Sequence, residues 1–125
     1  MIVGIGIDVV EIERLRAVLG RQKDRFLRRV FTLGEQEYCS KHRDPVPHYA
    51  VRFAAKESLF KALGTGWAGG VSWLDVEVSR ESGGAPTLAL SGAAQIVARE
   101  RGAQNIHISL SHSEQSAVAV VILEK

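Results

Sequence analysis

The sequence has few of the features that mark secreted, membrane-spanning or disulfide-bonded proteins. Its 125 residues include a single cysteine, Cys39, so no internal disulfide can form and a reducing, cytoplasmic location is expected. The residues after Met1 lack the basic and small-residue pattern of a secretory signal. The longest apolar run, Ala117–Leu123, has seven residues, far fewer than the ~20 that span a bilayer. We therefore expect neither secretion nor a membrane partner.

Several nucleotide-binding and hydrolase motifs are also missing. Gly4-x-Gly6-x-x-Val9 lacks the third glycine of the dinucleotide fingerprint, and there is no Walker A sequence, no G-x-S-x-G elbow and no cysteine cluster for zinc. His107 and His112 form only a weak metal pair, because the sequence offers no convincing third ligand beside them. No repeat, linker or low-complexity segment interrupts the chain, and its length predicts one domain over residues 1–125.

Positive charge gathers in the first half of the chain. The net charge is only +2, but residues 1–61 carry 12 Lys/Arg and 8 Asp/Glu, whereas residues 62–125 carry 4 and 6. A basic half favours an anionic partner, although a solvated helix face would have the same composition. We do not expect that partner to be a nucleic acid, since the second half is acidic and no binding motif is recognisable.

The hydrophobic pattern predicts an α+β fold. Alternation of apolar and polar residues favours strands at 2–10, 73–79, 86–90, 105–111 and 116–123. The helical period favours helices at 11–30, 33–41, 48–63 and 92–101. Gly20 is expected to break the first helix in two, Thr32 and Glu35 to cap the second, and Ser91 to cap the last. This mixed order of elements favours α+β over a regular βαβ alternation.

Polar side chains in apolar surroundings are the candidates for chemistry. Asp8 ends an apolar strand that carries Gly4 and Gly6 on the same face, where something can approach the backbone closely. A buried Asp8 carboxylate needs a cation, a hydrogen-bond network or a metal to compensate it. Glu57 and Lys61 lie four residues apart and share a helix face, which is also the pattern of an ordinary surface ion pair.

The remaining polar features fit phosphate chemistry when they are taken together. His107, Ser109 and Ser111 alternate with apolar residues, as on the exposed face of an amphipathic strand. Two carboxylates, a lysine, many arginines and the glycine-rich stretch 64–70 are the parts needed to hold Mg²⁺ and a phosphate. Spacing along the chain does not show that these groups converge.

Four segments resemble the bacterial holo-acyl-carrier-protein synthases, the short class of 4′-phosphopantetheinyl transferases. The segments are Gly6–Arg14, Arg52–Ser58, Lys61–Gly66 and His107–His112, in the family's order along nearly the whole chain. The resemblance implies the family's α+β fold, a small antiparallel sheet packed with helices. It also implies the reaction, in which the 4′-phosphopantetheine arm of coenzyme A moves to a serine of apo-acyl carrier protein. Adenosine 3′,5′-bisphosphate is released, and the holo-carrier supports fatty acid biosynthesis.

The resemblance also implies roles for individual residues. Asp8 and Glu57 would ligate Mg²⁺, Lys61 would neutralise or protonate the leaving phosphate, and Glu57 would take the serine proton directly or through a metal-bound water. The coenzyme A site would be lined by Arg52, Lys61, Gly64, Thr65, Gly66, Pro86, His107 and Ser109. An acidic carrier protein would dock on Arg14, Arg21 and Arg25. Ala85 departs from the family, since a basic residue often stands there, and Ser58 replaces a common alanine.

Assembly and the main alternative also follow from the resemblance. Short family members form trimers with active sites between subunits, which implies a homotrimer here. The last strand, Ala117–Leu123, is apolar on both faces and needs covering on both. The alternative is a non-catalytic module that binds coenzyme A or carrier protein. Because such a module would not need Asp8, Glu57 and Lys61 together, their joint presence favours the enzyme.

Overall fold

The computed structural model describes residues 1–65, 70–80 and 84–125. Its elements, in chain order, are β1 (Ile2–Glu11), α1 (Ile12–Val30), α2 (Leu33–Ser40), α3 (Val46–Leu63), the 3₁₀ turn η2 (Trp73–Asp75), β2 (Val76–Arg80), β3 (Pro86–Leu90), α4 (Gly92–Glu100), β4 (Asn105–His112) and β5 (Ser116–Glu124). The predicted α+β fold is confirmed. Among the described residues, no helix has the length and apolar character needed to cross a membrane.

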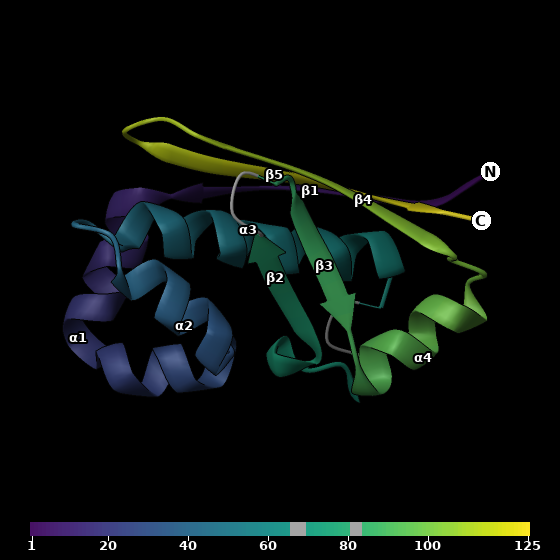
Figure 1. Ribbon diagram of the computed structural model, residues 1–125, viewed down its shortest axis with the longest axis horizontal. Helices are drawn as coiled ribbons and strands as arrows, with labels where there is room; N and C mark the ends of the chain where they lie inside the picture. The colour runs from purple at the N-terminus through teal and green to yellow at the C-terminus, as the bar shows by residue number, and fades with distance from the viewer. Residues whose placement is uncertain (66–69, 81–83) are drawn as a thin grey trace.

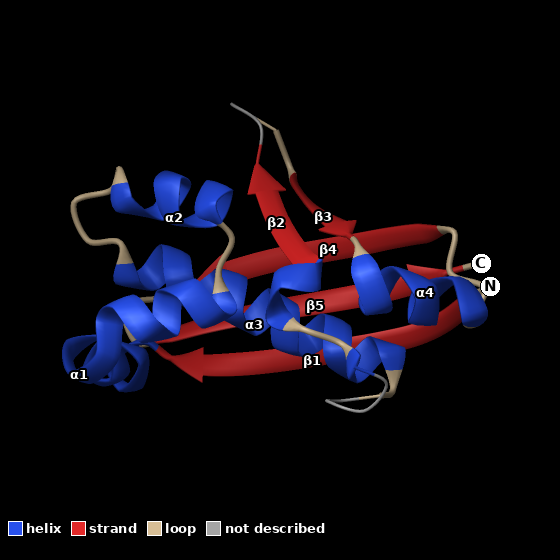
Figure 2. Ribbon diagram, turned by 90° about the horizontal axis from the view of Figure 1, so that it is seen from below, coloured by secondary structure: helices blue, strands red, loops and turns tan. Residues whose placement is uncertain are grey.

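A three-stranded antiparallel sheet forms one layer of the molecule. Its strand order is β1-β5-β4, and β2 and β3 form a separate antiparallel pair. Figure 1 shows α3 running along one side of this sheet, with the other described helices and the β2–β3 pair beyond it. In Figure 2 the β2–β3 pair lies beside β4, at the edge of the sheet away from β1.

Helix α3 lies directly against β1 because two glycines of that strand have no side chains. A Cβ atom at Gly4 would lie 2.2 Å from the carbonyl oxygen of Ala62, and one at Gly6 would lie 1.9 Å from that of Ser58. The close approach expected on the glycine face of β1 is therefore made by the backbone of α3. The opposite face of β1 is exposed: Ile5, Ile7 and Val9 are 65%, 57% and 59% accessible.

A buried ion pair joins the helical layer to the β2–β3 pair. Lys56 Nζ lies 2.7 Å from Glu35 Oε1, and both side chains are 0% exposed. The ammonium also donates to the carbonyl oxygens of Val30 and Trp73, at 2.6 and 3.1 Å. Glu35 Oε2 accepts from the backbone N–H of Val78 at 2.7 Å. Such a pair is tolerated in a core because both charges are compensated and further hydrogen bonded.

The expected break in the first helix is displaced. The chain leaves helical geometry at Gln22, with φ −150° and ψ 49°, whereas Gly20 stays helical. The prediction of a break at Gly20 was therefore wrong by two residues. The cap of the next helix is confirmed, since Thr32 and Glu35 form a reciprocal capping box at the start of α2.

Two other element boundaries differ from expectation by two or more residues, and the cap of α4 lacks its expected side-chain hydrogen bond. Residues 73–75 form a 3₁₀ turn instead of the start of a strand, because Ser72 and Asp75 form a capping box there. Ser91 occupies the N-cap of α4 without a side-chain hydrogen bond, and the Asp75 carboxylate accepts from Ala94 N at 3.3 Å instead. Helix α3 begins at Val46, two residues before the predicted start, since a proline is well accommodated in a first helical turn.

Substituting either of two glycines should change stability in opposite directions. In Gly6→Ala the added methyl meets the backbone of α3, and we expect the free energy of unfolding to fall by at least about 1–3 kcal/mol, as in overpacked cores. Gly20→Ala is the matched control, because Gly20 is helical and has nothing within 4 Å of its added Cβ. It should gain about 0.5–1 kcal/mol from helix propensity. Urea unfolding followed by circular dichroism measures both; equal midpoints would contradict the close-packing argument.

Candidate active site

Asp8 and Lys61 form an ion pair across the contact between β1 and α3. Lys61 Nζ donates to Asp8 Oδ1 at 3.0 Å and to the carbonyl oxygen of Ile7 at 2.9 Å. The Asp8 side chain is 18% exposed and that of Lys61 is 54% exposed. The sequence required a cation, a hydrogen-bond network or a metal to compensate the Asp8 charge. In the structure the ammonium group of Lys61 is that cation. The surface pair that Lys61 could have formed with Glu57 is not among the ion pairs of the described residues.

Glu57 lies half-buried beside this pair. Its burial raises the pKa of its carboxyl above the usual range, the negative charge of Asp8 raises that pKa further, and Lys61 lowers it. A half-buried carboxyl beside a second carboxylate and an ammonium suits proton transfer or the binding of a divalent cation.

The donor set fits a magnesium ion better than a soft metal. No group of three or more His, Cys, Asp and Glu side chains in the described part of the chain is arranged to hold a metal. Mg²⁺ does not need such a group, because it is bound by one or two carboxylates, keeps several waters and takes further oxygens from substrate phosphates. Asp8 and Glu57 provide that pair of carboxylates.

A pocket of about 350 Å³ opens next to the two carboxylates. Asp8, Glu57 and Arg14 line it, together with the apolar side chains Leu15, Val18, Phe26 and Phe53. The pocket thus joins the charged groups on β1 and α3 to the exposed surface of α1. It can take a ligand with a charged part and an apolar part.

The basic surface expected on the first helix is present on α1. Arg14, Arg21 and Arg25 are exposed, and none of them is in an ion pair within the described residues. Arg16, by contrast, pairs with Glu13 and Asp44, both at 2.8 Å. These three free guanidinium groups are available to an acidic partner.

The other predicted site residues divide between the two edges of the sheet. Gly64 ends α3 on the side of Lys61, in the left-handed conformation with φ +76°. Thr65 follows it, with a buried hydroxyl that has no hydrogen-bond partner among residues 1–65, 70–80 and 84–125. Residue 66, a predicted coenzyme A contact, lies outside the described residues, as do residues 81–83 of the expected β2–β3 turn.

His107, Ser109 and Pro86 do not join Asp8, Glu57 and Lys61 within one chain. His107 and Ser109 are on the exposed face of β4, and Pro86 begins β3 beside that strand. Figure 2 shows these strands at the edge of the sheet opposite β1. His107 Nε2 lies 3.0 Å from Glu124 Oε1, and this contact lowers the pKa of the Glu124 carboxyl.

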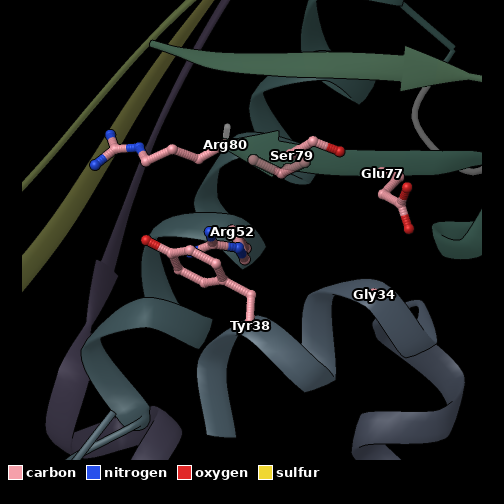
Figure 3. Close-up of a pocket in the computed structure, with 7 residues that line it drawn as sticks. Gly34, Tyr38, Arg52, Glu77, Ser79 and Arg80 are labelled. Carbon is pink, nitrogen blue, oxygen red and sulfur yellow. The ribbon is translucent and has the colours of Figure 1, made fainter. Parts of the chain in front are cut away.

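A second cluster of functional groups was not found from the sequence. Arg52, a predicted coenzyme A contact, lies with its guanidinium 4.1 Å from the centre of the Tyr38 ring (Figure 3). The ring of His48 stacks on that of His42 at 3.5 Å between centroids. These residues come from α2, α3 and the segment between them, so no motif within one element signals the cluster.

Comparisons with known proteins identify what the chain is similar to. Residues 4–121 match the model of the 4′-phosphopantetheinyl transferase superfamily. The holo-[acyl-carrier-protein] synthase of Koribacter versatilis is 51% identical over 124 residues, which cover 99% of both chains. The crystal structure of holo-[acyl-carrier-protein] synthase from Neisseria meningitidis has a TM-score of 0.90 at 33% identity, with full coverage of both chains. The Helicobacter pylori synthase in complex with coenzyme A has a TM-score of 0.84 at 33% identity and covers 96% of this chain and 99% of its own.

The charge coupling between the two carboxylates can be measured directly. In Asp8→Asn the pKa of Glu57 should fall, because a neighbouring negative charge that raises it is removed. In Lys61→Met the same pKa should rise, because a positive charge that favours the carboxylate is removed. Titration of the Glu57 side-chain carboxyl by ¹³C NMR measures both shifts. An unchanged pKa in both variants would mean that Glu57 does not interact with this ion pair.

Proposed function

The chain belongs to the 4′-phosphopantetheinyl transferase superfamily, and we propose that Asp8, Glu57 and Lys61 are the catalytic residues of its reaction. As a holo-[acyl-carrier-protein] synthase, it transfers the 4′-phosphopantetheine arm of coenzyme A to a serine of apo-acyl carrier protein. Coenzyme A is thus the co-substrate, and adenosine 3′,5′-bisphosphate is the second product. The contact between Asp8 and Lys61 beside the half-buried Glu57 is the observation that carries the assignment.

Each catalytic residue has a role that its surroundings favour. Glu57 accepts the proton of the carrier's serine hydroxyl as the oxygen attacks the phosphorus, since it is a half-buried carboxylate beside the Asp8–Lys61 pair. Lys61 presents its ammonium to the departing phosphate, whose negative charge it stabilises. Asp8 holds that ammonium in place at 3.0 Å.

Asp8 and Glu57 would also hold Mg²⁺. When bound, the ion would neutralise oxygens of the coenzyme A pyrophosphate. The raised pKa of Glu57 supports this assignment, because burial and the charge of Asp8 disfavour its carboxylate and a divalent cation would compensate both effects.

The basic surface of α1 is the docking site for the carrier protein. Arg14 lines the pocket that contains Asp8 and Glu57, and Arg21 and Arg25 continue the positive charge along the same helix. An acidic carrier helix would be steered to this surface and oriented by it, so that its serine reaches Glu57.

The working enzyme is a homotrimer of single-domain subunits (residues 1–125) with active sites between the subunits. The exposed face of β1 continues onto β5, because Ile5, Ile7 and Val9 stand opposite Ile122, Val120 and Val118. An apolar sheet face of this kind is typical of an interface between subunits. A neighbouring copy could also bring its β4 edge, with His107 and Ser109, to the Asp8 side of the first copy. Such an assembly would work in the cytoplasm, where holo-carrier is used in fatty acid biosynthesis.

The transfer reaction tests the catalytic assignment. The purified chain is incubated with coenzyme A, Mg²⁺ and apo-acyl carrier protein, and the intact mass of the carrier is measured. Wild-type protein should add one phosphopantetheine group, and Asp8→Asn and Glu57→Gln should each lower kcat by about 10²-fold or more. Arg14→Glu should act differently and mainly raise the KM for the carrier protein.

Controls separate the assignment from its alternatives. Circular dichroism confirms that each variant is folded, and a transferase of known activity confirms that the carrier is competent. Binding of coenzyme A without any mass gain would indicate a non-catalytic binding module. Near-wild-type turnover in both carboxylate variants would show that the metal and base assignments are wrong.

The assembly can be tested with two substitutions at equally exposed isoleucines. Ile7 on β1 and Ile96 on α4 are both 57% exposed. Ile7→Glu should convert trimers to monomers and abolish transfer, because it places a charge on the apolar sheet face. Ile96→Glu should change neither property. Light scattering coupled to size-exclusion chromatography measures the mass, and a trimeric Ile7→Glu variant would move the interface elsewhere.

A further inference from the structure

Arg16 differs from the docking arginines of α1 because its guanidinium is bound by two carboxylates of the chain itself. Its Nε donates to Glu13 Oε2 on the same helix at 2.8 Å. Its Nη1 and Nη2 donate to the two carboxylate oxygens of Asp44, at 3.1 and 2.8 Å. This second contact is bidentate, and two parallel hydrogen bonds fix the geometry more strictly than a single ion pair does. Arg16 is therefore not a free cation on the basic surface, and its contacts indicate a different role.

Asp44 connects this guanidinium to the beginning of α3. It lies two residues before the helix, and its Oδ1 accepts from the backbone N–H of Val46 in the first turn at 3.2 Å. A carboxylate is favourable there because the N-terminus of a helix carries partial positive charge. Arg16 holds the pKa of the Asp44 carboxyl below its usual range, so the carboxylate is charged near neutral pH. One carboxylate thus joins α1 to the helix that carries Glu57 and Lys61.

Three successive residues fix the rotation of α1 about its axis. Arg14 lines the pocket that contains Glu57, Leu15 is 4% exposed in the core, and Arg16 is bound to Asp44. Because successive helical residues are about 100° apart, Arg14 and Arg16 point to nearly opposite sides, with Leu15 between them. A rotation of the helix that turned Arg14 away from the pocket would therefore also break the contact between Arg16 and Asp44.

We propose that Arg16 and Asp44 are positioning residues for the transfer reaction, and that their bidentate contact sets the orientation of the docking surface on α1 relative to Glu57. This inference rests on the proposed function. The carrier protein binds to α1, whereas the groups that act on its serine lie on β1 and α3. The contact between the two helices therefore determines how the serine hydroxyl faces Glu57 in the bound complex. Small displacements of reacting groups are costly, since about 1 Å can lower a rate by about 10²-fold.

Asp44→Asn separates this role from a direct contact between Arg16 and the carrier protein. The substitution removes one negative charge and releases the Arg16 guanidinium, while the asparagine oxygen can still accept from Val46 N. If Arg16 acted by attracting an acidic carrier, the released guanidinium would lower the KM for the carrier. If Arg16 acts by holding α1 against α3, the same substitution lowers kcat instead. The two roles thus predict different responses to one variant.

Steady-state transfer with variants of both residues measures the effect. Asp44→Asn and Arg16→Met should each lower kcat by about two- to fivefold, the value of an exposed ion pair with good geometry. The variant with both substitutions should be no slower than the slower single variant, because both remove the same contact. Arg16→Lys should recover part of the loss, since it keeps the charge without the planar fork. The KM for coenzyme A should stay unchanged, because neither residue lines a pocket with Arg52.

Glu13→Gln is the matched control, since it removes the other carboxylate that binds Arg16 and changes the net charge by the same amount. Glu13 lies on α1 itself, so its substitution leaves the connection to α3 in place. Its kcat should equal that of the wild type, and circular dichroism confirms that each variant is folded. Equal kcat values in Asp44→Asn and Glu13→Gln, or a lower KM for the carrier with unchanged kcat in Asp44→Asn, would overturn the proposal.

A titration tests the contact between the two residues without requiring turnover. In Arg16→Met the pKa of the Asp44 carboxyl should rise, because the guanidinium that lowers it is removed. Titration of that carboxyl by ¹³C NMR measures the shift, and an unchanged pKa would overturn the proposal. Normal transfer by both the wild type and Asp44→Asn would leave the proposed function standing and remove only this positioning role. A wild type that transfers nothing to a competent carrier would overturn the proposed function and the positioning role together.

Discussion

The arrangement of the catalytic groups depends on the backbone contact between α3 and β1. At Gly4 and Gly6 there is no room for even a methyl group, because the carbonyls of Ala62 and Ser58 occupy the space. Because α3 packs so closely on β1, the Lys61 ammonium reaches both the Asp8 carboxylate and the Ile7 carbonyl. A larger separation would leave Asp8 without its cation and Glu57 without the neighbour that raises its pKa. The two glycines are therefore as much a part of the site as the charged residues.

The buried pair of Lys56 and Glu35 has a complementary role on the other side of α3. It fixes α3 relative to α2 and β2, since Glu35 receives both the ammonium and the Val78 N–H. Arg52, one turn before Lys56, is then held beside Tyr38 and the end of β2. One helix thus places an acidic group on β1 next to Lys61 and a basic pocket next to Arg52.

Features contained within one element could be predicted from the sequence, and contacts between distant elements could not. The capping box of Thr32 and Glu35 and the alternation of His107, Ser109 and Ser111 are local, and both are confirmed. The sequence did not identify the ion-pair partner of Lys61. Its spacing to Glu57 fits an ordinary surface pair, and its contact with Asp8 on β1 depends on how the helix packs on the strand. Gly20 has the weakest helix propensity in its segment, but the difference of about 1 kcal/mol is small enough for packing to move the break to Gln22. The roles of Asp8 and Glu57 came from the family resemblance, since burial and spacing only made them candidates.

The strand order has a consequence for how the chain acquires its structure during synthesis. Both β1 and β4 pair only with β5 in the three-stranded sheet, and β5 is formed by residues 116–124. Strand β1 therefore has α3 against its glycine face early, but it has no hydrogen-bonded neighbour in this sheet until residues 116–124 have been translated. The sheet forms only after these residues are available, and pairing between segments so distant in sequence is slow compared with helix formation.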